Sequence, residues 1–425
     1  ALEGAPRPKA GVWAVRAGRV LAGNLRRAAK GRPLRSWRPQ KQALTMLGLG
    51  GGEAVAWRNG ISLSGRLIWC WKDHIDRRWM AMYQKPMRMR AASQPMRCGG
   101  CGAKLGAEAL AGMLRTLPVA EAPDILLGLA APDDAALVQP PAGHVVVQSV
   151  DHFRAFIDDP FLFGEIAAAH ALSDIHAMGA RPWTALAIAA VPYAPGARMR
   201  SDLEAMMRGA AEVLAGDGCA LVGGHSGEAA ELALGFAVSG LVAPRQAWRK
   251  SGLCAGDALI LTKPLGTGVI LAANMRGLAR ARWLQVALAS MRRTNAEAAG
   301  ILHAHGVTAC TDVTGFGLLG HLNEMLRASG MGAVVFAEEV PLLPGALDLA
   351  HQGIESTLAP ENRAALPPGE RGALADLLID PQTSGGLLAG VSQARAEACL
   401  SALVAARLEA AVVGMVEPGA ALRLG

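Results

Sequence analysis

The 425-residue chain has few aromatic residues and no long apolar run. Aromatic side chains make up only 4% of it, so a hydrophobic core must be built from Ala, Leu, Val and Ile. No apolar segment approaches the roughly 18–20 residues that cross a bilayer, and no signal-peptide pattern opens the chain. We therefore expect neither a transmembrane segment nor a cleaved secretion signal.

Cysteine is also scarce. Seven cysteines are too few and too scattered for a disulfide framework in a chain this long, which favours a reducing compartment and predicts a cytoplasmic protein. They are Cys70, Cys98, Cys101, Cys219, Cys254, Cys310 and Cys399.

The net charge of +7 hides an asymmetry along the chain. Residues 1–97 carry 20 Lys and Arg against 4 Asp and Glu, whereas residues 98–425 carry 22 against 31. Such asymmetry can mark a nucleic-acid or membrane contact. We interpret residues 1–97 as a basic segment of separate origin and residues 98–425 as an acidic body that binds divalent metal.

The basic segment contains recognisable local patterns. Residues 12–27 predict a short basic helix, and residues 43–56 predict a hairpin that turns at three glycines. Trp71, Ile75 and Trp79 are spaced as on one face of an amphipathic helix. A linker with two prolines follows over residues 85–97.

From about residue 145 onward, apolar strands alternate with Ala-rich helices, and a boundary is expected near residues 241–252. We predict an α+β body of two domains, 98–245 and 246–425, with sheets covered by helices on one face, after the basic segment 1–97. The expected elements are strands at 145–150, 185–191, 232–242 and 258–262 and helices at 163–178 and 203–214.

Cys98 and Cys101 form a CxxC pair that is followed by Lys104 on a glycine-rich stretch. A zinc site would need a second such pair, which the other cysteines do not offer. A lysine three residues from a thiol lowers the pKa of the thiol and favours the thiolate. The pattern indicates a nucleophile on a mobile arm; two incidental thiols in a linker are the alternative.

Aspartates recur beside apolar strand residues or glycine-rich turns, where a solvated charge would be unusual. Each one alone reads equally well as a helix cap or turn residue. Gathered together, such carboxylates suit Mg²⁺ that bridges nucleotide phosphates. They are Asp133, Asp134, Asp151, Asp174 and Asp312.

Three glycine-rich segments, 223–227, 263–268 and 380–386, read as tight turns. Glycine lets backbone N–H groups converge on phosphate oxygens, but none of the three matches a P-loop or a dinucleotide fingerprint. Ordinary turns of an α/β protein explain them equally well.

Taken together, these segments resemble selenophosphate synthetase (selenide, water dikinase) of the aminoimidazole ribonucleotide synthetase superfamily. The resemblance covers about residues 97–425 in unbroken order. Its most specific pieces are Cys101-Gly-Ala-Lys104, Asp133-Asp134-Ala-Ala, Ala171–Gly179, Gly223-Gly-His-Ser226, Thr311–His321 and Asp380–Gly386.

This resemblance implies that ATP, selenide and water become selenophosphate, AMP and orthophosphate. It implies Mg²⁺, a K⁺ requirement and a homodimer that holds ATP between subunits; a protein that delivers selenium is a candidate partner, and no nucleic acid is expected. By the same resemblance Cys101 and Lys104 are catalytic, and Cys101 would deliver selenium or protect selenide. The implied metal ligands are Asp134, Asp151, Asp174 and Asp312, and the implied nucleotide contacts are Lys104, Asp151, Asp174, Gly223, Gly224, His225 and Ser226.

Two positions depart from the family pattern. His170 stands where many members have Asn, and it reads equally as a nucleotide contact and as a packed or capping histidine. Cys98 adds a second thiol, which is either a resolving or selenium-relaying partner of Cys101 or an unengaged thiol.

The first 97 residues are similar to the tail of a pyridine nucleotide-disulfide flavoprotein of the membrane-associated NADH or sulfide dehydrogenase kind. Lys9–Gly18 resembles the segment that closes on FAD there. Because this chain lacks the nucleotide-binding halves of such a flavoprotein, we expect it to bind no FAD by itself.

Two other functions compete with this interpretation. One is a different enzyme of the same superfamily, such as thiamine-monophosphate kinase or a hydrogenase maturation factor, against which Cys101 and Lys104 argue. The other is a protein that docks on membranes or RNA through its basic segment. No RNA-binding motif is visible, and a solvated basic remnant is the simpler explanation.

Overall fold

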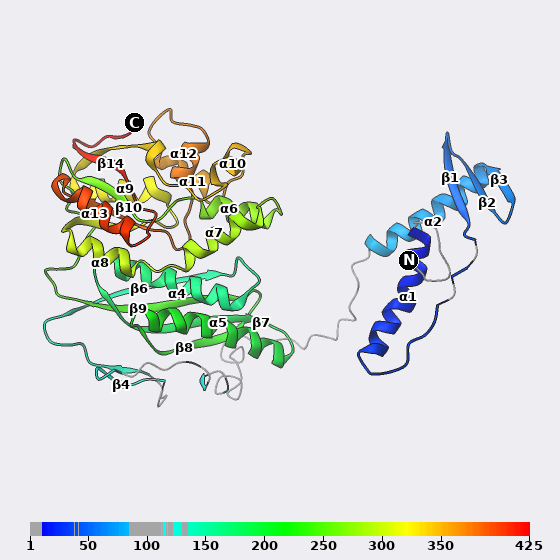
Figure 1. Cartoon of the computed structure of the whole chain (residues 1–425), viewed down its shortest axis with the longest axis horizontal. Coiled ribbons are helices and arrows are strands. Elements are labelled where there is room, and N and C mark those ends of the chain that lie inside the picture. The colour runs from blue at the N-terminus through cyan, green and yellow to red at the C-terminus, as the bar shows by residue number, and fades with distance from the viewer. Residues whose placement is uncertain are drawn as a thin grey trace. The chain divides into compact units, whose positions relative to one another are not determined.

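The structure is a computed structural model that describes residues 11–37, 39–40, 42–84, 112, 114–115, 117, 122–129 and 135–425. The chain forms two compact units, residues 1–96 and residues 97–425 (Figure 1). None of the helices within the described ranges is long and apolar enough to cross a membrane.

The first unit combines two helices with a small antiparallel sheet of order β1-β2-β3. The helix expected over residues 12–27 and the hairpin expected over residues 43–56 are both confirmed. Trp71 and Trp79 lie on the second helix, and both remain partly exposed. The elements are α1 (Gly11–Ala28), β1 (Thr45–Gly50), β2 (Glu53–Arg58), β3 (Ile61–Gly65) and α2 (Arg66–Gln84).

The second unit contains a four-stranded sheet of order β6-β9-β7-β8, with α4 and α5 packed on one face (Figure 1). β7 and β8 are parallel and are joined through α5, whereas the other pairs are antiparallel. All the strands and helices predicted for this part are confirmed. They are β6 (Val145–Arg154), α4 (Pro160–Ala177), β7 (Arg181–Pro192), α5 (Gly196–Gly216), β8 (Ala220–Ala229) and β9 (Ala233–Val242), after a short pair β4 (Ile125–Leu127) and β5 (Leu137–Val138).

α4 is the central helix of this unit. It begins where the side chain of Asp159 accepts hydrogen bonds from Phe161 N (3.0 Å) and Leu162 N (3.2 Å), with Pro160 in the first turn. Most of its residues are buried because α4 packs on the four-stranded sheet and on α5. It also contacts the second domain of this unit, which is described below. A helix that is buried on nearly all sides is apolar on nearly all sides, which makes its polar residues conspicuous.

Glycine lets α4 and α5 approach closely. A Cβ atom at Gly164 would lie 1.9 Å from Met206 O, and a Cβ atom at Gly209 would lie 2.1 Å from Phe161 O. Neither backbone oxygen can move away without shifting its helix. These two residues therefore set the distance between the helices.

We expect Gly209→Ala to lower the free energy of unfolding by about 2–3 kcal/mol, because the added methyl overpacks a rigid contact. Gly300→Ala is the matched control: Gly300 is also helical, but a Cβ there meets nothing within 4 Å. This control should be neutral or stabilising by up to about 1 kcal/mol. Urea unfolding of both variants measures the difference, and equal responses would contradict the close contact.

The opposite face of the first sheet carries apolar side chains in the open. Val150 is 62% exposed, and Leu186 and Ile188 of β7 are also exposed. Successive residues of a strand alternate between faces, so these side chains belong to the face away from α4 and α5. Among the described residues, helices therefore cover one face of this sheet, as predicted.

The second domain is built on a six-stranded sheet of order β11-β13-β10-β14-β12-β15. In Figure 1 its elements, coloured yellow-green to red, lie beside those of the first domain. α4 of the first domain contacts α7, α8 and β11 of the second. The principal elements are β10 (Ala258–Leu261), α6 (Thr267–Met275), α7 (Ala281–Arg292), α8 (Ala296–Ala304), β11 (Val307–Asp312), α9 (Gly317–Ser329), β12 (Met331–Val335), α10 (Ala346–His351), α11 (Ala359–Asn362), α12 (Ala373–Leu378), β13 (Leu387–Val391), α13 (Gln393–Ala405), β14 (Ala411–Pro418) and β15 (Leu422–Leu424), with 3-10 turns at Ala337–Glu339 and Arg363–Ala365.

Candidate active site

Three of the predicted aspartates converge where the two domains meet. Asp151 lies within β6, Asp174 within α4, and Asp312 is the last residue of β11. The carboxyl groups of Asp151 and Asp174 hydrogen-bond to each other, and Ser149 also donates to Asp174. Asp312 interacts electrostatically with both. Asp312 ends its strand, whereas the strand expected over residues 145–150 continues through Asp151 to Arg154.

The cluster concentrates negative charge in a partly buried place. Burial, followed by the charge of Asp174, raises the pKa of Asp151 to about 6. The same two causes raise the pKa of Asp312 to about 7, although a hydrogen bond from Ser173 opposes the rise. The charged forms of carboxylates that repel one another in this way are stabilised by a cation that binds between them.

Mg²⁺ binds to oxygen ligands, and the three carboxylates supply such ligands. Among the described residues, no group of three or more His, Cys, Asp or Glu side chains is arranged so that it could hold a metal ion by itself. Mg²⁺ does not require one, since it keeps several waters and is bound through one or two carboxylates plus substrate phosphates. Hard oxygen donors with raised pKa values fit that mode of binding.

A buried cation lies close to this cluster. Lys263 Nζ donates to Arg293 O (2.5 Å) and Ser384 O (2.9 Å). Burial and the nearby Arg293 charge lower the pKa of Lys263 to about 7, and the charge of Asp312 opposes this shift. Lys263 was noticed in the sequence only as part of a glycine-rich turn, because nothing local shows that its charge interacts with that of Asp312.

His170 is a packed residue that connects α4 to the 380–386 loop. Its Nδ1 accepts a hydrogen bond from Ser384 N (3.0 Å), and its ring packs edge-on against Phe153 at a centroid distance of 5.1 Å. Burial lowers the pKa of His170 to about 4. The ring is therefore neutral near pH 7, and its Nε2, 3.9 Å from Asp151 Oδ1, forms no ion pair there.

Gly223, Gly224, His225 and Ser226 do not form the turn that was expected. They lie inside β8, paired with β7, and Gly224 takes a φ of +155° where a Cβ would lie 2.3 Å from Ala187 O. A glycine run looks like a turn in sequence, but here pairing with a neighbouring strand decides its conformation. β8 is three strand spacings from β6, roughly 14 Å, so one chain does not bring these residues to Asp151.

The other two glycine-rich segments are turns that dock on each other. Gln382 Oε1 accepts from Gly266 N (3.0 Å) and Thr267 N (3.1 Å), and Asp380 Oδ2 accepts from Val269 N (3.2 Å). These N–H groups belong to the first turn of α6. Because protein side chains already satisfy them, the turns build the domain rather than a phosphate cradle.

Several predicted residues lie outside the described part of the chain: Cys98, Cys101, Lys104, Asp133 and Asp134. Sequence reasoning also missed one residue inside it. Asn295, just before α8, donates to Ser173 Oγ and Gly385 O. A Thr-Asn pair before a helix reads as an ordinary cap, so no local signal could have found it.

Comparison with known proteins assigns both domains to one family. Residues 132–242 match the AIR synthase related protein, N-terminal domain, and residues 255–425 match the corresponding C-terminal domain. Together these matches span most of the second unit.

Two curated relatives match over nearly their whole length. The selenide, water dikinase of Pelobacter propionicus is 41% identical over 335 residues, which cover 76% of this chain and 94% of that protein. The selenide, water dikinase of Myxococcus xanthus is 40% identical over 345 residues, which cover 79% and 97%.

Solved structures of other enzymes share the fold. Thiamine-monophosphate kinase from Stenotrophomonas maltophilia superposes with a TM-score of 0.59 at 25% identity, over 76% of this chain and 97% of that one. Hydrogenase maturation protein HypE in complex with ATP superposes with a TM-score of 0.54 at 17% identity, over 70% and 82%. With sequence identity near 40% over almost all of each curated relative, the chain belongs to the selenide, water dikinase family.

Proposed function

We propose that this chain uses ATP to convert selenide and water to selenophosphate, AMP and orthophosphate. The family and the continuous match to its curated members support this activity. The structural observation that carries it is the convergence of Asp151, Asp174 and Asp312. Phosphoryl transfer depends mainly on positioning and on neutralising charge, and a carboxylate cluster is the part of such a site that recruits the metal.

In this proposal Asp134, Asp151, Asp174 and Asp312 would hold Mg²⁺, which would supply positive charge to offset that of the ATP phosphates. Ser149 and Ser173 orient the carboxylates through the hydrogen bonds that they donate. The partly buried position strengthens these interactions, because a low dielectric screens charge less than water does.

Lys104 and Cys101 complete the proposed chemistry. Lys104 offsets negative charge that develops on the transferring phosphoryl group. Cys101 is not the phosphate acceptor, since selenium is; it delivers selenium or protects selenide. A thiolate is favoured there because Lys104 is three residues away.

We further propose a homodimer that pairs through the exposed face of the first sheet and holds ATP between subunits. The open apolar side chains of β6 and β7 support the interface. The separation of β8 from Asp151 supports a shared site, because the glycine-rich strand of one copy can then serve the carboxylates of the other. In a single chain these two groups of residues stay apart.

Val150→Lys should convert the dimer to a monomer, because it places an unpaired charge within the proposed interface. Sedimentation equilibrium measures the change in mass. Val404→Lys is the control, since Val404 is similarly exposed but lies on α13 of the second domain. A dimer that persists in Val150→Lys would remove this face from the proposal.

Other expectations belong to the same proposal. They comprise a K⁺ requirement, a cytoplasmic location, a selenium-delivery partner, and no FAD binding by this chain itself. The division of the body at residues 245/246 is also proposed, and it falls between the two family domains.

Phosphorus NMR of a reaction with ATP, Mg²⁺ and selenide tests the function. Selenophosphate, AMP and orthophosphate in equal amounts are expected. ADP as the product, formed only when thiamine monophosphate replaces selenide, would instead favour the kinase activity of the Stenotrophomonas relative. The same protein without added selenide is the blank.

A further inference from the structure

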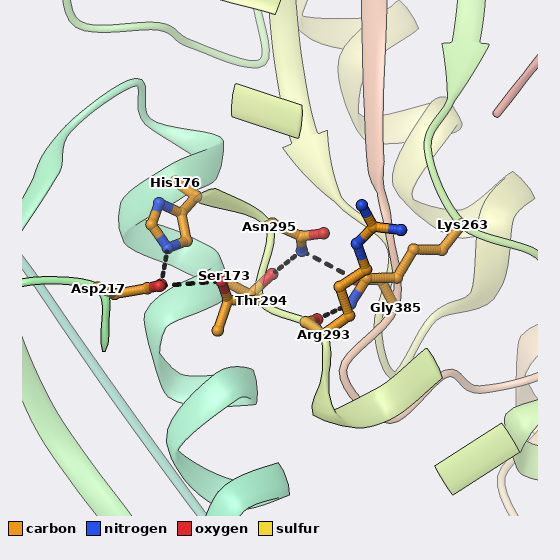
Figure 2. A network of polar contacts seen from close by, with 8 residues as sticks. All are labelled: Ser173, His176, Asp217, Lys263, Arg293, Thr294, Asn295 and Gly385. Carbon is orange, nitrogen blue, oxygen red and sulfur yellow. Dashed lines mark hydrogen bonds and ion pairs between the residues drawn. The ribbon is translucent and has the colours of Figure 1, made fainter. Parts of the chain in front are cut away.

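Asn295 lies at the junction of the two domains and is almost completely buried. It precedes α8 in the second domain, and its side chain is 1% exposed. Its amide nitrogen Nδ2 donates to Ser173 Oγ (3.0 Å) on α4 and to Gly385 O (2.9 Å) in the 380–386 loop (Figure 2). One side chain therefore connects three segments that lie far apart in the sequence.

The direction of these hydrogen bonds is fixed by chemistry. A backbone carbonyl only accepts, so the NH₂ end of the Asn295 amide must face Gly385 O. A reversed amide would set its own oxygen against that carbonyl. Both amide hydrogens are then used, and the Ser173 oxygen necessarily acts as the acceptor from Asn295.

This direction determines what Ser173 does next. Since its oxygen already accepts from Asn295, its hydroxyl hydrogen is free to point elsewhere. Ser173 donates to the carboxylate of Asp312 and so favours the charged form of that group. The hydrogen bonds run in one direction, from Asn295 to Ser173 to Asp312.

We propose that Asn295 is a positioning residue that acts through Ser173 to orient Asp312 for metal binding. Asn295 and Asp312 come from the second domain and Ser173 from the first, so the orientation of the carboxylate depends on the packing of the domains. This inference rests on the proposed function, because it takes the carboxylate cluster to be the metal site.

A second contact at the same junction provides a comparison. Thr294 Oγ1 donates to Asp217 Oδ1 (3.1 Å), and Asp217 Oδ2 lies 2.9 Å from His176 Nε2 (Figure 2). This contact also joins the domains but involves none of the three clustered carboxylates. A substitution of Thr294 therefore loosens the domain junction but leaves intact the hydrogen bonds that reach Asp312.

The test titrates Mn²⁺ into the full chain and follows the free ion by electron paramagnetic resonance. Asn295→Ala should weaken Mn²⁺ binding by on the order of tenfold to a hundredfold, the usual effect of losing a partner that orients a metal ligand. Ser173→Ala should weaken it similarly. The double variant should be no weaker than Ser173→Ala, because both changes break one path.

Asn362→Ala is the matched control. Asn362 is also a buried asparagine whose Nδ2 donates to two backbone oxygens, Gly315 O (2.9 Å) and Ile379 O (3.0 Å), but it does not contact Ser173. Asn362→Ala and Thr294→Val should lose stability and keep Mn²⁺ affinity within about twofold. If Asn295→Ala does not fold, Asn295→Ser retains a helix-capping residue that is too short to reach Ser173.

The outcomes separate the two levels of the argument. Wild-type protein that binds no Mn²⁺ would overturn the proposed metal site and this inference with it. Wild-type protein that binds, with Asn295→Ala no weaker than Asn362→Ala, would overturn the inference alone. Additive effects of the Asn295 and Ser173 substitutions would also overturn it, because independent losses mean that Asn295 does not act through Ser173.

Discussion

Asp312→Asn should reduce selenide-dependent ATP consumption by about a thousandfold or more, the scale of losing a major charge-stabilising group in a phosphoryl-transfer site. Asparagine keeps the size of the side chain but removes the charge that attracts Mg²⁺. The protein should still fold, because the charges that act most strongly on Asp312 are those of Asp174 and Asp151, which repel it.

The same substitution should make the metal-free protein more stable, and more so at pH 8 than at pH 5. Burial and the Asp174 charge raise the pKa of Asp312 from 3.8 to about 7. A carboxyl group whose pKa is raised by folding binds its proton more tightly in the folded state, so stability falls as pH rises from about 4 through 7. Asparagine cannot ionise and escapes this loss.

Thermal unfolding at both pH values, with metal removed by chelator, measures the effect. Asp348→Asn is the control, since Asp348 is an exposed residue of α10 and should leave both activity and the pH dependence unchanged. An Asp312→Asn protein that is no more stable than wild type at pH 8 would show that the clustered carboxylates do not repel one another in the folded protein.

Cys101→Ala should abolish selenide-dependent ATP consumption. The expectation comes from the sequence pattern and the family, in which this thiol accompanies Lys104. If the thiol delivers selenium or protects selenide, no other group in the carboxylate cluster can replace it, because a carboxylate lacks the nucleophilic sulfur of a thiolate.

Cys254→Ala is the control for Cys101→Ala. Cys254 is an exposed free thiol in the second domain, so its loss tests whether any accessible cysteine affects the assay. We expect full activity in Cys254→Ala and none in Cys101→Ala, measured as the rate of selenide-dependent AMP release. An active Cys101→Ala protein would remove this residue from the mechanism.

The elements of the fold were readable from sequence wherever one physical pattern dominated. The helix expected over 163–178 became α4, and the strand expected over 232–242 became β9, because continuous burial leaves a continuous apolar run. The hairpin expected around Gly50–Gly52 was also found, since glycines accept the positive φ angles of the turn.

Prediction from sequence was wrong or incomplete where the conformation or contact of a residue depends on a partner that is distant in the chain. Gly223–Gly227 looks like a turn, yet β7 draws it into an extended strand. Asn295 looks like a helix cap, yet its amide reaches Ser173, 122 residues away in the chain. No local preference carries information about such partners.

The sequence by itself determined the order of strands and helices, the motifs of the family and the residue types that suit phosphate and metal chemistry. These depend on side-chain polarity, spacing and glycine content, which are local properties. Only the tertiary structure decided that Asp151, Asp174 and Asp312 meet, that Lys263 is buried beside them and that β8 stands apart. Those facts depend on how α4 packs between a sheet and a second domain, and electrostatic coupling over a few ångströms arises only once that packing exists.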